Sequence, residues 1–306
     1  MLTIAIILDW IMGEPPNKLH PVAWLGKLIS LEERFAPQTG KVAQFICGVG
    51  IVILDVLLFA LPVYWLLNYA WTVSPVVYMI VGGLLLKVSF SLRFLVQSAM
   101  KIKSLLEAEK IDDARFNLRS LVSRDTGSLD KPHMVSAAIE SVAENVTDSF
   151  IAPLFYFLIL GVPGAIAYRV VNTLDAMIGY HGRYEYLGKA AARLDDALNY
   201  IPARLTALLI VASAFLTGRK KGVNAWRILY RDNGQTESPN AGWPMSAMAG
   251  ALNVQLEKEG FYKLGNGQKQ PIPLDIRGSV YLTLITAGIW FIICLAIAGV
   301  RHAYFP

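Results

Sequence analysis

The sequence predicts an all-α polytopic membrane protein, and three observations indicate that class. Apolar residues make up 55% of the 306 residues and charged residues only 17%, whereas soluble domains carry about 25% charged residues. Residues 42–67, 73–100 and 279–300 each exceed the length of about 20 apolar residues that a transmembrane helix needs. The polar segments between them are mostly helical in pattern. We therefore expect one integral-membrane domain over residues 1–306, with three transmembrane helices and helical cytoplasmic loops.

The first two spans are separated only by residues 68–72, with Ser74 as the expected N-cap and Pro75 in the first helical turn. This predicts a tight antiparallel hairpin whose helix centres lie at one depth. Asp55 and Lys87 are equally far from the turn, so we expect them to meet near mid-membrane. A single charge there costs about 2.5 to 3.5 kcal/mol. A structural ion pair is the first interpretation, and a proton or ion path is the second.

Two shorter apolar stretches, residues 150–160 and 203–217, allow two topologies. Residues 150–160 extend about 16 Å, at about 1.5 Å per residue, before Gly161-Val162-Pro163-Gly164 interrupts them. A five-span count sends residues 169–201 outside. In the alternative, residues 150–160 and 165–178 form a re-entrant hairpin, and the polar segment after Tyr180 returns to the cytoplasm.

The distribution of Lys and Arg predicts the orientation. Basic residues precede the first span and follow the second, whereas residues 68–72 contain none. Basic loops mark the cytoplasmic side, so we expect a multi-pass plasma-membrane protein with a cytoplasmic N-terminus. The net charge of +5 then needs no nucleic-acid partner. Cys47 and Cys294 lie in apolar runs and do not suit a disulfide scaffold or a zinc site. Gly265-Asn266-Gly267, within residues 261–272, is expected to join two short strands.

An acidic stripe marks the helix that we expect to follow an Asp130 cap, with Pro132 in its first turn. Its acidic side chains recur every four residues, within about 80° of one face, and an asparagine lies at the edge of the stripe. These residues are Glu140, Glu144, Asp148 and Asn145. A solvated acidic face is one interpretation. Binding of a divalent cation or a cationic substrate is the other. No Lys or Arg lies between Lys131 and the apolar segment that follows, which favours the second.

A second polar cluster follows further along the chain. It contains Asn172, Asp175, Arg193, Asp195, Asp196 and Arg204. Carboxylates suit Mg²⁺, and Arg side chains suit phosphate. Adjacent Asp195 and Asp196 cannot both face one side of a helix, so one of them is free to cap or to pair with Arg193. No Walker A, G-x-G-x-x-G or G-x-S-x-G motif occurs, so these local motifs do not establish nucleotide use.

Taken together, these segments resemble the adenosylcobinamide-phosphate synthase family of cobalamin biosynthesis along nearly the whole chain. The matching motifs are Asp9-Trp10-Ile11-Met12-Gly13-Glu14-Pro15-Pro16 with His20-Pro21, Arg124-Asp125-Thr126, Glu140-Ser141-Val142-Ala143-Glu144-Asn145 with Asp148, Ala152-Pro153-Leu154-Phe155, Asn172-Thr173-Leu174-Asp175, Arg193-Leu194-Asp195-Asp196, Ile201-Pro202-Ala203-Arg204 and Ser238-Pro239-Asn240-Ala241-Gly242-Trp243-Pro244. Family members often have Asp-Pro-Pro and Asp-Ser-Met where this chain has Glu14-Pro15-Pro16 and Asp175-Ala176-Met177. Neither difference removes a carboxylate.

The resemblance implies a membrane carbon–nitrogen ligase that uses ATP and Mg²⁺. It would join adenosylcobyric acid, a corrinoid, to aminopropanol phosphate or to aminopropanol through an amide bond. The implied metal ligands are Glu140, Glu144, Asp148 and Asp175, with Asp195 or Asp196 completing the shell. The implied catalytic residues are Asp125 or His20 as the proton acceptor, together with Glu144. The implied substrate-binding residues are Asp9, Glu14, Arg124, Asn145, Asn172, Arg193, Arg204, Asn240 and Trp243, with the three Arg side chains holding phosphate.

Two other classes of protein remain as alternatives. A Mg²⁺-dependent prenyl or phosphoalcohol transferase would also place two acidic clusters beside a membrane, but it would not explain residues 238–244. A transporter is the non-enzyme alternative, and the Asp55 and Lys87 pair alone favours it.

Overall fold

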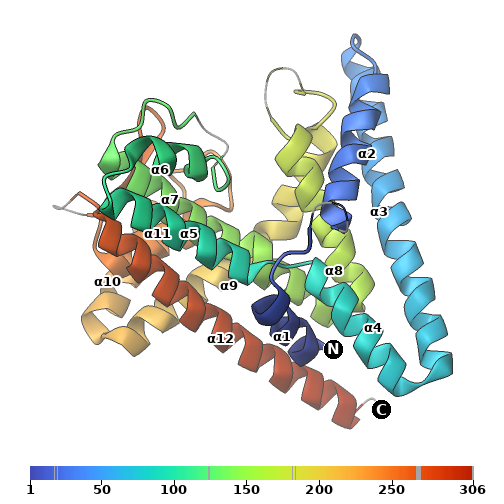
Figure 1. Cartoon of the computed structure of the whole chain (residues 1–306). Coiled ribbons are helices and arrows are strands. Elements are labelled where there is room, and N and C mark those ends of the chain that lie inside the picture. The colour runs from blue at the N-terminus through green and yellow to red at the C-terminus, as the bar shows by residue number, and fades with distance from the viewer. Residues whose placement is uncertain are drawn as a thin grey trace. The chain divides into compact units, whose positions relative to one another are not determined.

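The computed structural model describes residues 1–16, 18, 20–122, 125–180, 182, 184–266 and 270–304. Contacts between Cα atoms divide the chain into two compact units. The first unit comprises Met1–Ser91 and Ala152–Asn199, and the second comprises Leu92–Ile151 and Tyr200–Pro306. The prediction of a single domain is not tested by this division. In chain order (Figure 1) the elements are α1 (Leu2–Met12), α2 (Pro21–Phe35), α3 (Lys41–Val73), α4 (Pro75–Val88), α5 (Leu92–Glu107), α6 (Ile111–Leu118), α7 (Lys131–Val146), the π-helix η1 (Thr147–Ile151), α8 (Ala152–Ile178), α9 (Lys189–Thr217), α10 (Arg219–Asp232), α11 (Gly242–Leu252), β1 (Leu256–Lys258), β2 (Tyr262–Leu264) and α12 (Pro273–Tyr304).

The all-helical membrane fold class is confirmed. Within the described residues, five helical segments are long and apolar enough to cross a membrane: Lys41–Val73, Pro75–Glu107, Lys131–Ile178, Lys189–Thr217 and Pro273–Arg301. Three of these segments correspond to the three predicted transmembrane spans, residues 42–67, 73–100 and 279–300. Residues 203–217 are only the apolar part of a longer helix, which begins at Lys189 and continues through Pro202. The first turns of α9 are polar, so the apolar length of the sequence did not show where this helix begins.

In the first unit, α3 and α4 form the expected antiparallel hairpin (Figure 1). Ser74 Oγ accepts a hydrogen bond from Val76 N over 3.1 Å, and Pro75 occupies the first turn of α4, so the predicted cap is confirmed. The helix α3 extends to Val73, which makes the turn shorter than residues 68–72 suggested. Near this turn Trp65, Tyr69 and Trp71 are exposed. Exposed Trp and Tyr rings are typical of a membrane–water interface.

The apolar stretch of residues 73–100 is divided between α4 and α5, although Pro75–Glu107 as a whole is a candidate span, as predicted. The break covers residues 89–91. Ser89 is buried, and its hydroxyl donates a hydrogen bond to Leu86 O over 2.7 Å. A serine that binds the backbone in this way competes with helical hydrogen bonding. The boundary between the two units lies at the same place, after Ser91.

The helix α8 folds back on itself at the glycine-proline segment. Gly161 has φ 70° and ψ −165°, a conformation that L-residues rarely adopt. The rings of Tyr156 and Tyr168 stack at a centroid distance of 5.3 Å. A straight helix would separate residues twelve apart by about 18 Å, at about 1.5 Å per residue. This is the bend that the re-entrant interpretation requires, and the depth of the segment in a bilayer remains a prediction.

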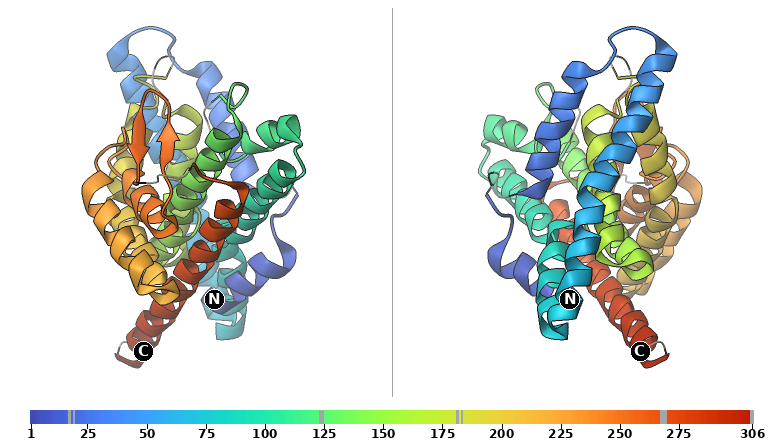
Figure 2. Two further views of the ribbon diagram at one scale, coloured as in Figure 1. Left: turned by 90° about the vertical axis from the view of Figure 1, so that its left-hand side faces the viewer. Right: turned by 90° about the vertical axis from the view of Figure 1, so that its right-hand side faces the viewer.

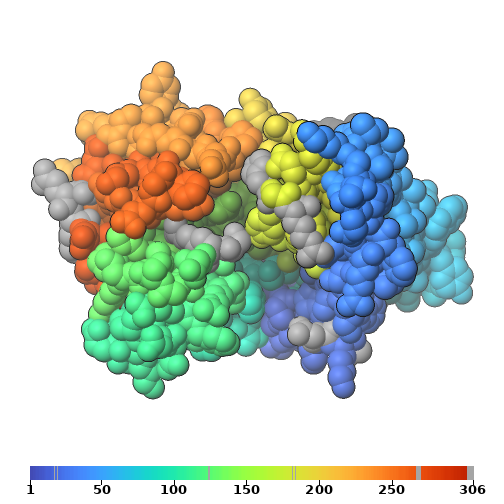
Figure 3. Space-filling model, turned by 90° about the horizontal axis from the view of Figure 1, so that it is seen from above, coloured from blue at the N-terminus to red at the C-terminus, as the bar shows by residue number. Residues whose placement is uncertain are grey.

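In the second unit, α5, α11, α12 and the β-hairpin pack against α7. Asp130 caps α7 as predicted, because its Oδ1 accepts a hydrogen bond from His133 N over 2.9 Å. Figure 2 shows the two orange strands of the hairpin, and in Figure 3 an orange surface lies beside a green surface.

The position of the β-hairpin differs from the prediction. Strands β1 and β2 pair antiparallel, with Leu256 opposite Leu264, and both of these side chains are buried. The chain reverses before β2, where Gly260 adopts a φ of 76°. The predicted turn at residues 265–267 is therefore wrong for the described residues, Gly265 and Asn266, while Gly267 lies outside them. Burial of both leucines selects this register, which composition alone did not reveal.

Candidate functional site

Two predicted site residues of the N-terminal motif lie around one lysine of the first unit. Lys87 Nζ of α4 is 2.9 Å from Glu14 Oε1 and 3.3 Å from Asp9 Oδ1. The Asp9 side chain is 1% exposed, and the helix α1 that carries it packs against α4. Although burial opposes ionisation of Glu14, hydrogen bonds from His20 and Lys87 hold its pKa below the usual value.

His20 uses both of its ring nitrogens in this network. Its Nδ1 accepts a hydrogen bond from Val22 N over 3.2 Å and caps α2, while Nε2 lies 2.6 Å from Glu14 Oε2. A ring that accepts at Nδ1 carries its proton on Nε2, so we assign the Nε2–H tautomer, which donates to Glu14. This geometry gives His20 a structural task. Its role as a proton acceptor stays a prediction without support from these contacts.

The predicted ion pair between Asp55 and Lys87 is not formed. Lys87 is paired with Asp9 and Glu14 instead. The prediction used the register of the α3–α4 hairpin alone, and it could not include α1, whose packing on α4 supplies two carboxylates. The transporter alternative loses the feature that favoured it.

Asp55 is fully buried, and Glu32 of α2 lies beside it. Apart from the Glu32 carboxyl, no group of a described residue is placed to donate to either carboxylate oxygen of Asp55. Burial, together with the neighbouring Asp55 carboxyl, raises the pKa of Glu32 to about 7. A contact between two carboxyl groups requires a proton on one of them, so near neutral pH this pair is expected to share one proton.

The acidic stripe begins with a residue whose two oxygens are both occupied. Glu140 is 4% exposed. Its Oε1 accepts from the Ser136 hydroxyl over 2.6 Å, and its Oε2 accepts from the Tyr262 hydroxyl over 2.9 Å. Ser136 Oγ also accepts from Glu257 N over 2.8 Å. Glu140 therefore joins α7 to the β-hairpin, and its predicted metal-binding role would require these hydroxyl bonds to rearrange.

The rest of the stripe is half-buried at the end of α7. Glu144 and Asn145 lie in the last turn, and Asn145 Nδ2 donates to both the carbonyl and the hydroxyl oxygen of Ser141. Asp148 lies in the π-helix η1, so it does not continue the α-helical spacing that the prediction assumed. Pro153 has no N–H for the carbonyl of Ser149, which favours a widened turn here. Such turns recur at functional sites.

The Arg124-Asp125-Thr126 motif is a tight loop in the part of it that is described. Arg124 lies outside the described residues. Asp125 is exposed, and its Oδ1 accepts from Gly127 N over 2.9 Å. Thr126 is buried, and its hydroxyl donates to Arg115 O over 3.0 Å. Asp125 is accessible to a ligand, but its proton-accepting role remains a prediction.

In the first unit, Asn172 and Asp195 meet as neighbours. Asn172 Nδ2 donates to Asp195 Oδ1 over 3.3 Å, and Asn199 Nδ2 donates to Asp195 Oδ2 over 2.9 Å. Arg193 is largely exposed and makes a long ion pair of 3.9 Å with Asp196. The two adjacent aspartates thus have different partners, as their separation of about 100° around the helix favours.

Asp175 is half-buried near the C-terminal end of α8 and needs a glycine beside it. A Cβ atom on Gly179 would lie 2.0 Å from Asp175 Oδ1. A side chain at position 179 would therefore displace the carboxylate. This close approach is a structural reason for Gly179 in the Asn172–Gly179 segment.

Arg204, Asn240 and Trp243, all predicted to bind substrate, converge in the second unit. The Arg204 guanidinium lies 3.5 Å from the Tyr200 ring centroid and 4.5 Å from that of Trp243. Its Nη1 donates to Tyr200 O over 2.7 Å and to Asn240 Oδ1 over 3.3 Å. No described residue accepts from its Nε or Nη2. A stacked guanidinium with donors to spare suits phosphate recognition.

The loop that carries Asn240 is held by a serine side chain of its own. Ser238 Oγ accepts from the backbone N–H groups of Asn240 and Ala241, over 3.2 and 3.3 Å. A Cβ on Gly242 would lie 2.2 Å from Asn233 O, so only glycine fits. This local geometry explains the tight Ser238–Pro244 segment and fixes Asn240, which is 6% exposed, against Arg204.

Among the residues that the structure describes, no three His, Cys, Asp or Glu side chains form a metal cluster. The predicted metal ligands are divided between the units, with Glu140, Glu144 and Asp148 in the second and the others in the first. Mg²⁺ in phosphoryl-transfer sites commonly uses one or two carboxylates and the phosphates of its substrate. The half-buried Glu144 and Asp148 therefore fit that ion without a larger cluster.

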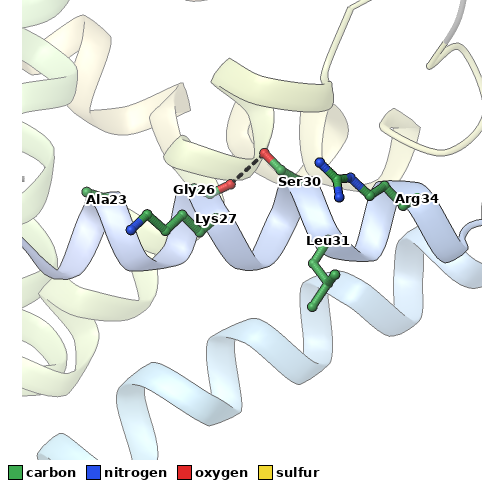
Figure 4. Close-up of a pocket in the computed structure, with 6 residues that line it drawn as sticks. All are labelled: Ala23, Gly26, Lys27, Ser30, Leu31 and Arg34. Atoms are coloured by element: carbon green, nitrogen blue, oxygen red, sulfur yellow. Dashed lines mark hydrogen bonds between the residues drawn. The ribbon is translucent and has the colours of Figure 1, made fainter. Parts of the chain in front are cut away.

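Two pockets lie away from the predicted site residues. One, of about 400 Å³, follows α2 (Figure 4), where the side chains of Lys27 and Arg34 flank Ser30, whose hydroxyl donates to Gly26 O over 2.8 Å. The other, of about 450 Å³, lies between the start of α7 and the β-hairpin, beside His133 and Glu257. No predicted site residue lines either pocket.

Sequence reasoning missed several partners of the predicted residues. Asn199 and Tyr200 lie four residues after Asp195 and four before Arg204, so helical spacing was an available signal for both. Ser136 precedes Glu140 by the same spacing. Tyr168 and Tyr262 are brought to their partners by tertiary folding, and the sequence contains no local signal for them.

Comparison with known proteins gives a consistent result. A family model described as "CobD/Cbib protein" matches residues 2–299. The cobalamin biosynthesis protein CobD of Dehalococcoides mccartyi is 51% identical over 294 residues, covering 96% of this chain and 95% of that protein. The probable cobalamin biosynthesis protein CobD of Methanothermobacter thermautotrophicus is 43% identical over 303 residues, covering 96% and 98%.

No solved structure matches this chain. The family model covers nearly all of the chain, and the similarity includes both units described above. The chain therefore belongs to the CobD/CbiB family of cobalamin biosynthesis proteins.

Proposed function

We propose that this protein forms an amide bond between the carboxyl group of adenosylcobyric acid and the amine of aminopropanol phosphate, or of aminopropanol, with ATP hydrolysis and Mg²⁺. The observation that carries the proposal furthest is the convergence of Arg204, Asn240 and Trp243 from separate motifs of the chain. Together they offer a cation with unused donors beside an aromatic face. A phosphorylated amino alcohol or ATP has the phosphate, and a corrinoid has the apolar face, that such a surface would bind.

The chemistry requires activation of the carboxylate, because oxide is a poor leaving group. Transfer of the γ-phosphoryl group of ATP to the carboxylate would give an acyl phosphate and ADP. Attack by the deprotonated amine would then form the amide and release inorganic phosphate, and the amine proton would pass to a base. Mg²⁺ would neutralise phosphate charge in the first step. Glu144 and Asp148 would hold the ion, and Arg204 would orient a phosphate group.

The proposed location is the plasma membrane, with several spans and a cytoplasmic N-terminus. The five candidate spans and the exposed Trp65, Tyr69 and Trp71 support the membrane location. The basic residues that precede the first span and follow the second support the orientation. ATP and the corrinoid substrate would reach the site from the cytoplasm.

Purified protein incubated with adenosylcobyric acid, aminopropanol phosphate and Mg-ATP tests the proposal. Mass spectrometry should detect the amide, with one inorganic phosphate and one ADP released per product. Reactions that lack the amino alcohol or ATP serve as controls. Release of pyrophosphate and AMP would exclude the acyl-phosphate route, and absence of amide with both amino alcohols would reject the function.

A further inference from the structure

A buried series of hydrogen bonds in the first unit ends on Asp195. The Tyr168 side chain is 1% exposed, and its hydroxyl donates to Asn199 Oδ1 over 2.8 Å. Asn199, itself 3% exposed, donates from Nδ2 to Asp195 Oδ2 over 2.9 Å. The opposite amide orientation would turn the Asn199 carbonyl oxygen towards the carboxylate, where two acceptors would face each other. The Tyr168 hydroxyl therefore supports the orientation in which Asn199 donates to Asp195.

A second arm reaches the other oxygen of the same carboxylate. Arg169 Nη1 donates to Asn172 Oδ1 over 3.4 Å, and Asn172 Nδ2 donates to Asp195 Oδ1 over 3.3 Å. Two adjacent residues of α8, Tyr168 and Arg169, thus bind the oxygens of two amides. Each amide in turn directs its NH₂ group to one oxygen of Asp195.

Both donors to Asp195 are neutral amides, and no cation of a described residue pairs with it. A carboxylate has about four acceptor positions, so further positions on Asp195 remain. Its neighbour Asp196 adds negative charge rather than balancing it. An oriented carboxylate without an internal cation is suited to a cationic ligand.

We propose that Tyr168 and Asn199 are positioning residues that orient Asp195 to accept a cation of the reaction, either Mg²⁺ or the ammonium group of the amino alcohol. This inference rests on the proposed ligase function for the identity of the two cations. The shared chemistry is binding of a cation by an oriented carboxylate.

Tyr156 provides a matched control. Its ring stacks on that of Tyr168 at 5.3 Å, but its hydroxyl donates to Leu198 O over 2.9 Å. Pro202 has no N–H, so the Leu198 carbonyl lacks its helical donor, and Tyr156 supplies one. Tyr156→Phe therefore removes a half-buried structural hydroxyl from the same stack without removing a hydrogen bond of the series that leads to Asp195.

The experiment compares wild type, Tyr168→Phe and Tyr156→Phe in the full-length protein. Calorimetry measures the binding of Mg²⁺ alone and of aminopropanol phosphate alone, and steady-state assays measure kcat and KM. We expect Tyr168→Phe to lose about 10- to 100-fold in affinity for one of the two ligands. Changes to residues that orient a ligating side chain commonly weaken metal binding by this much. Tyr156→Phe should stay within about twofold in affinity, although its melting temperature falls. The ligand whose affinity falls identifies the cation that Asp195 holds.

A second comparison uses Asp195→Asn as the background. If Tyr168 acts through Asp195, adding Tyr168→Phe to this background should cause no further loss of binding. Three outcomes would each overturn the inference. The two tyrosine variants could have equal effects on affinity, or Tyr168→Phe could have an undiminished effect in the Asp195→Asn background. The third outcome is that neither ligand binds to the wild type. Should the wild type bind these ligands but form no amide, the ligase function would fail while the binding comparison still decided the inference.

Discussion

Lys87 donates a hydrogen bond from Nζ to Glu14 Oε1 over 2.9 Å, across 73 positions of the chain. The same Nζ lies 3.3 Å from Asp9 Oδ1. One lysine of an apolar helix thereby holds both acidic residues of the N-terminal motif. Removing one partner of a buried ion pair is costly because the remaining charge stays desolvated.

Lys87→Met should therefore destabilise the protein by about 3 kcal/mol, since it leaves Asp9 and Glu14 without their cation. The combined change with Glu14→Gln should cost less than the sum of the two single changes. Denaturation in detergent, analysed as a double-mutant cycle, measures this coupling. Lys87→Met combined with Asp55→Asn is the control and should be additive. Coupling to Asp55 rather than Glu14 would contradict the observed network.

Glu144→Gln should preserve folding and membrane insertion while reducing turnover by about 100-fold and weakening the response to Mg²⁺. The motivation is its half-buried position beside the π-helix that carries Asp148. Asp113→Asn, at an exposed acidic residue of α6, is the control and should have no effect. The activity of wild type and of both variants is measured as a function of Mg²⁺ concentration. If Glu144→Gln has the same Mg²⁺ dependence as the wild type, the acidic stripe has a structural role.

Arg204→Lys should lower kcat/KM by at least about tenfold, because a lysine keeps the charge but loses the contacts of the planar guanidinium with the rings of Tyr200 and Trp243. The loss should be larger with aminopropanol phosphate than with aminopropanol if Arg204 binds the phosphate of the amino alcohol. Arg219→Lys, at the exposed start of α10, provides the control. Equal losses with both amino alcohols would assign Arg204 to ATP or to the corrinoid.

The raised pKa of Glu32 predicts that the free energy of unfolding depends on pH. Its pKa rises from 4.5 to about 7 in the folded chain because of burial and of Asp55. The stability that its protonated form contributes is complete below 4.5 and is lost as pH rises to about 7. Glu32→Gln should remove this loss, which we expect to be roughly 1 kcal/mol after solvent screening.

Melting temperatures of wild type and Glu32→Gln at about pH 5 and about pH 8 test this pH dependence. The exposed residue Glu109 offers a control, since Glu109→Gln should keep the wild-type dependence. If Glu32→Gln and wild type lose the same stability between the two pH values, Glu32 does not carry the effect.

The bend at Gly161 makes membrane topology measurable. Single cysteines at the exposed positions Lys189 and Glu237, in a cysteine-free background, can be labelled by impermeant reagents from each side of sealed vesicles. Thr39, before the first span, and Thr72, in the last turn of α3, are both exposed and provide the two reference sides. Labelling of position 189 from the same side as position 39 supports the re-entrant hairpin. Labelling only from the side of position 72 would support a crossing by residues 150–178.

The sequence by itself determined the membrane class, the caps at Ser74 and Asp130, and the residues that carry the family's motifs. These features depend on local properties, namely apolar length, capping chemistry and residue order, which a single sequence contains. The glycine-proline segment likewise predicted a bend that the Tyr156–Tyr168 stack confirms.

Only the tertiary structure decided which charged and polar groups are partners. Lys87 meets Glu14 because α1 packs on α4, and Glu140 meets Tyr262 because the β-hairpin packs on α7. Tyr168 reaches Asn199 because α8 folds back at Gly161. Each pairing joins groups far apart in sequence, and its geometry follows from helix packing and the requirement that buried polar groups be satisfied. Periodicity within one element predicts which face a side chain occupies, but the residue opposite that face depends on how the other elements pack.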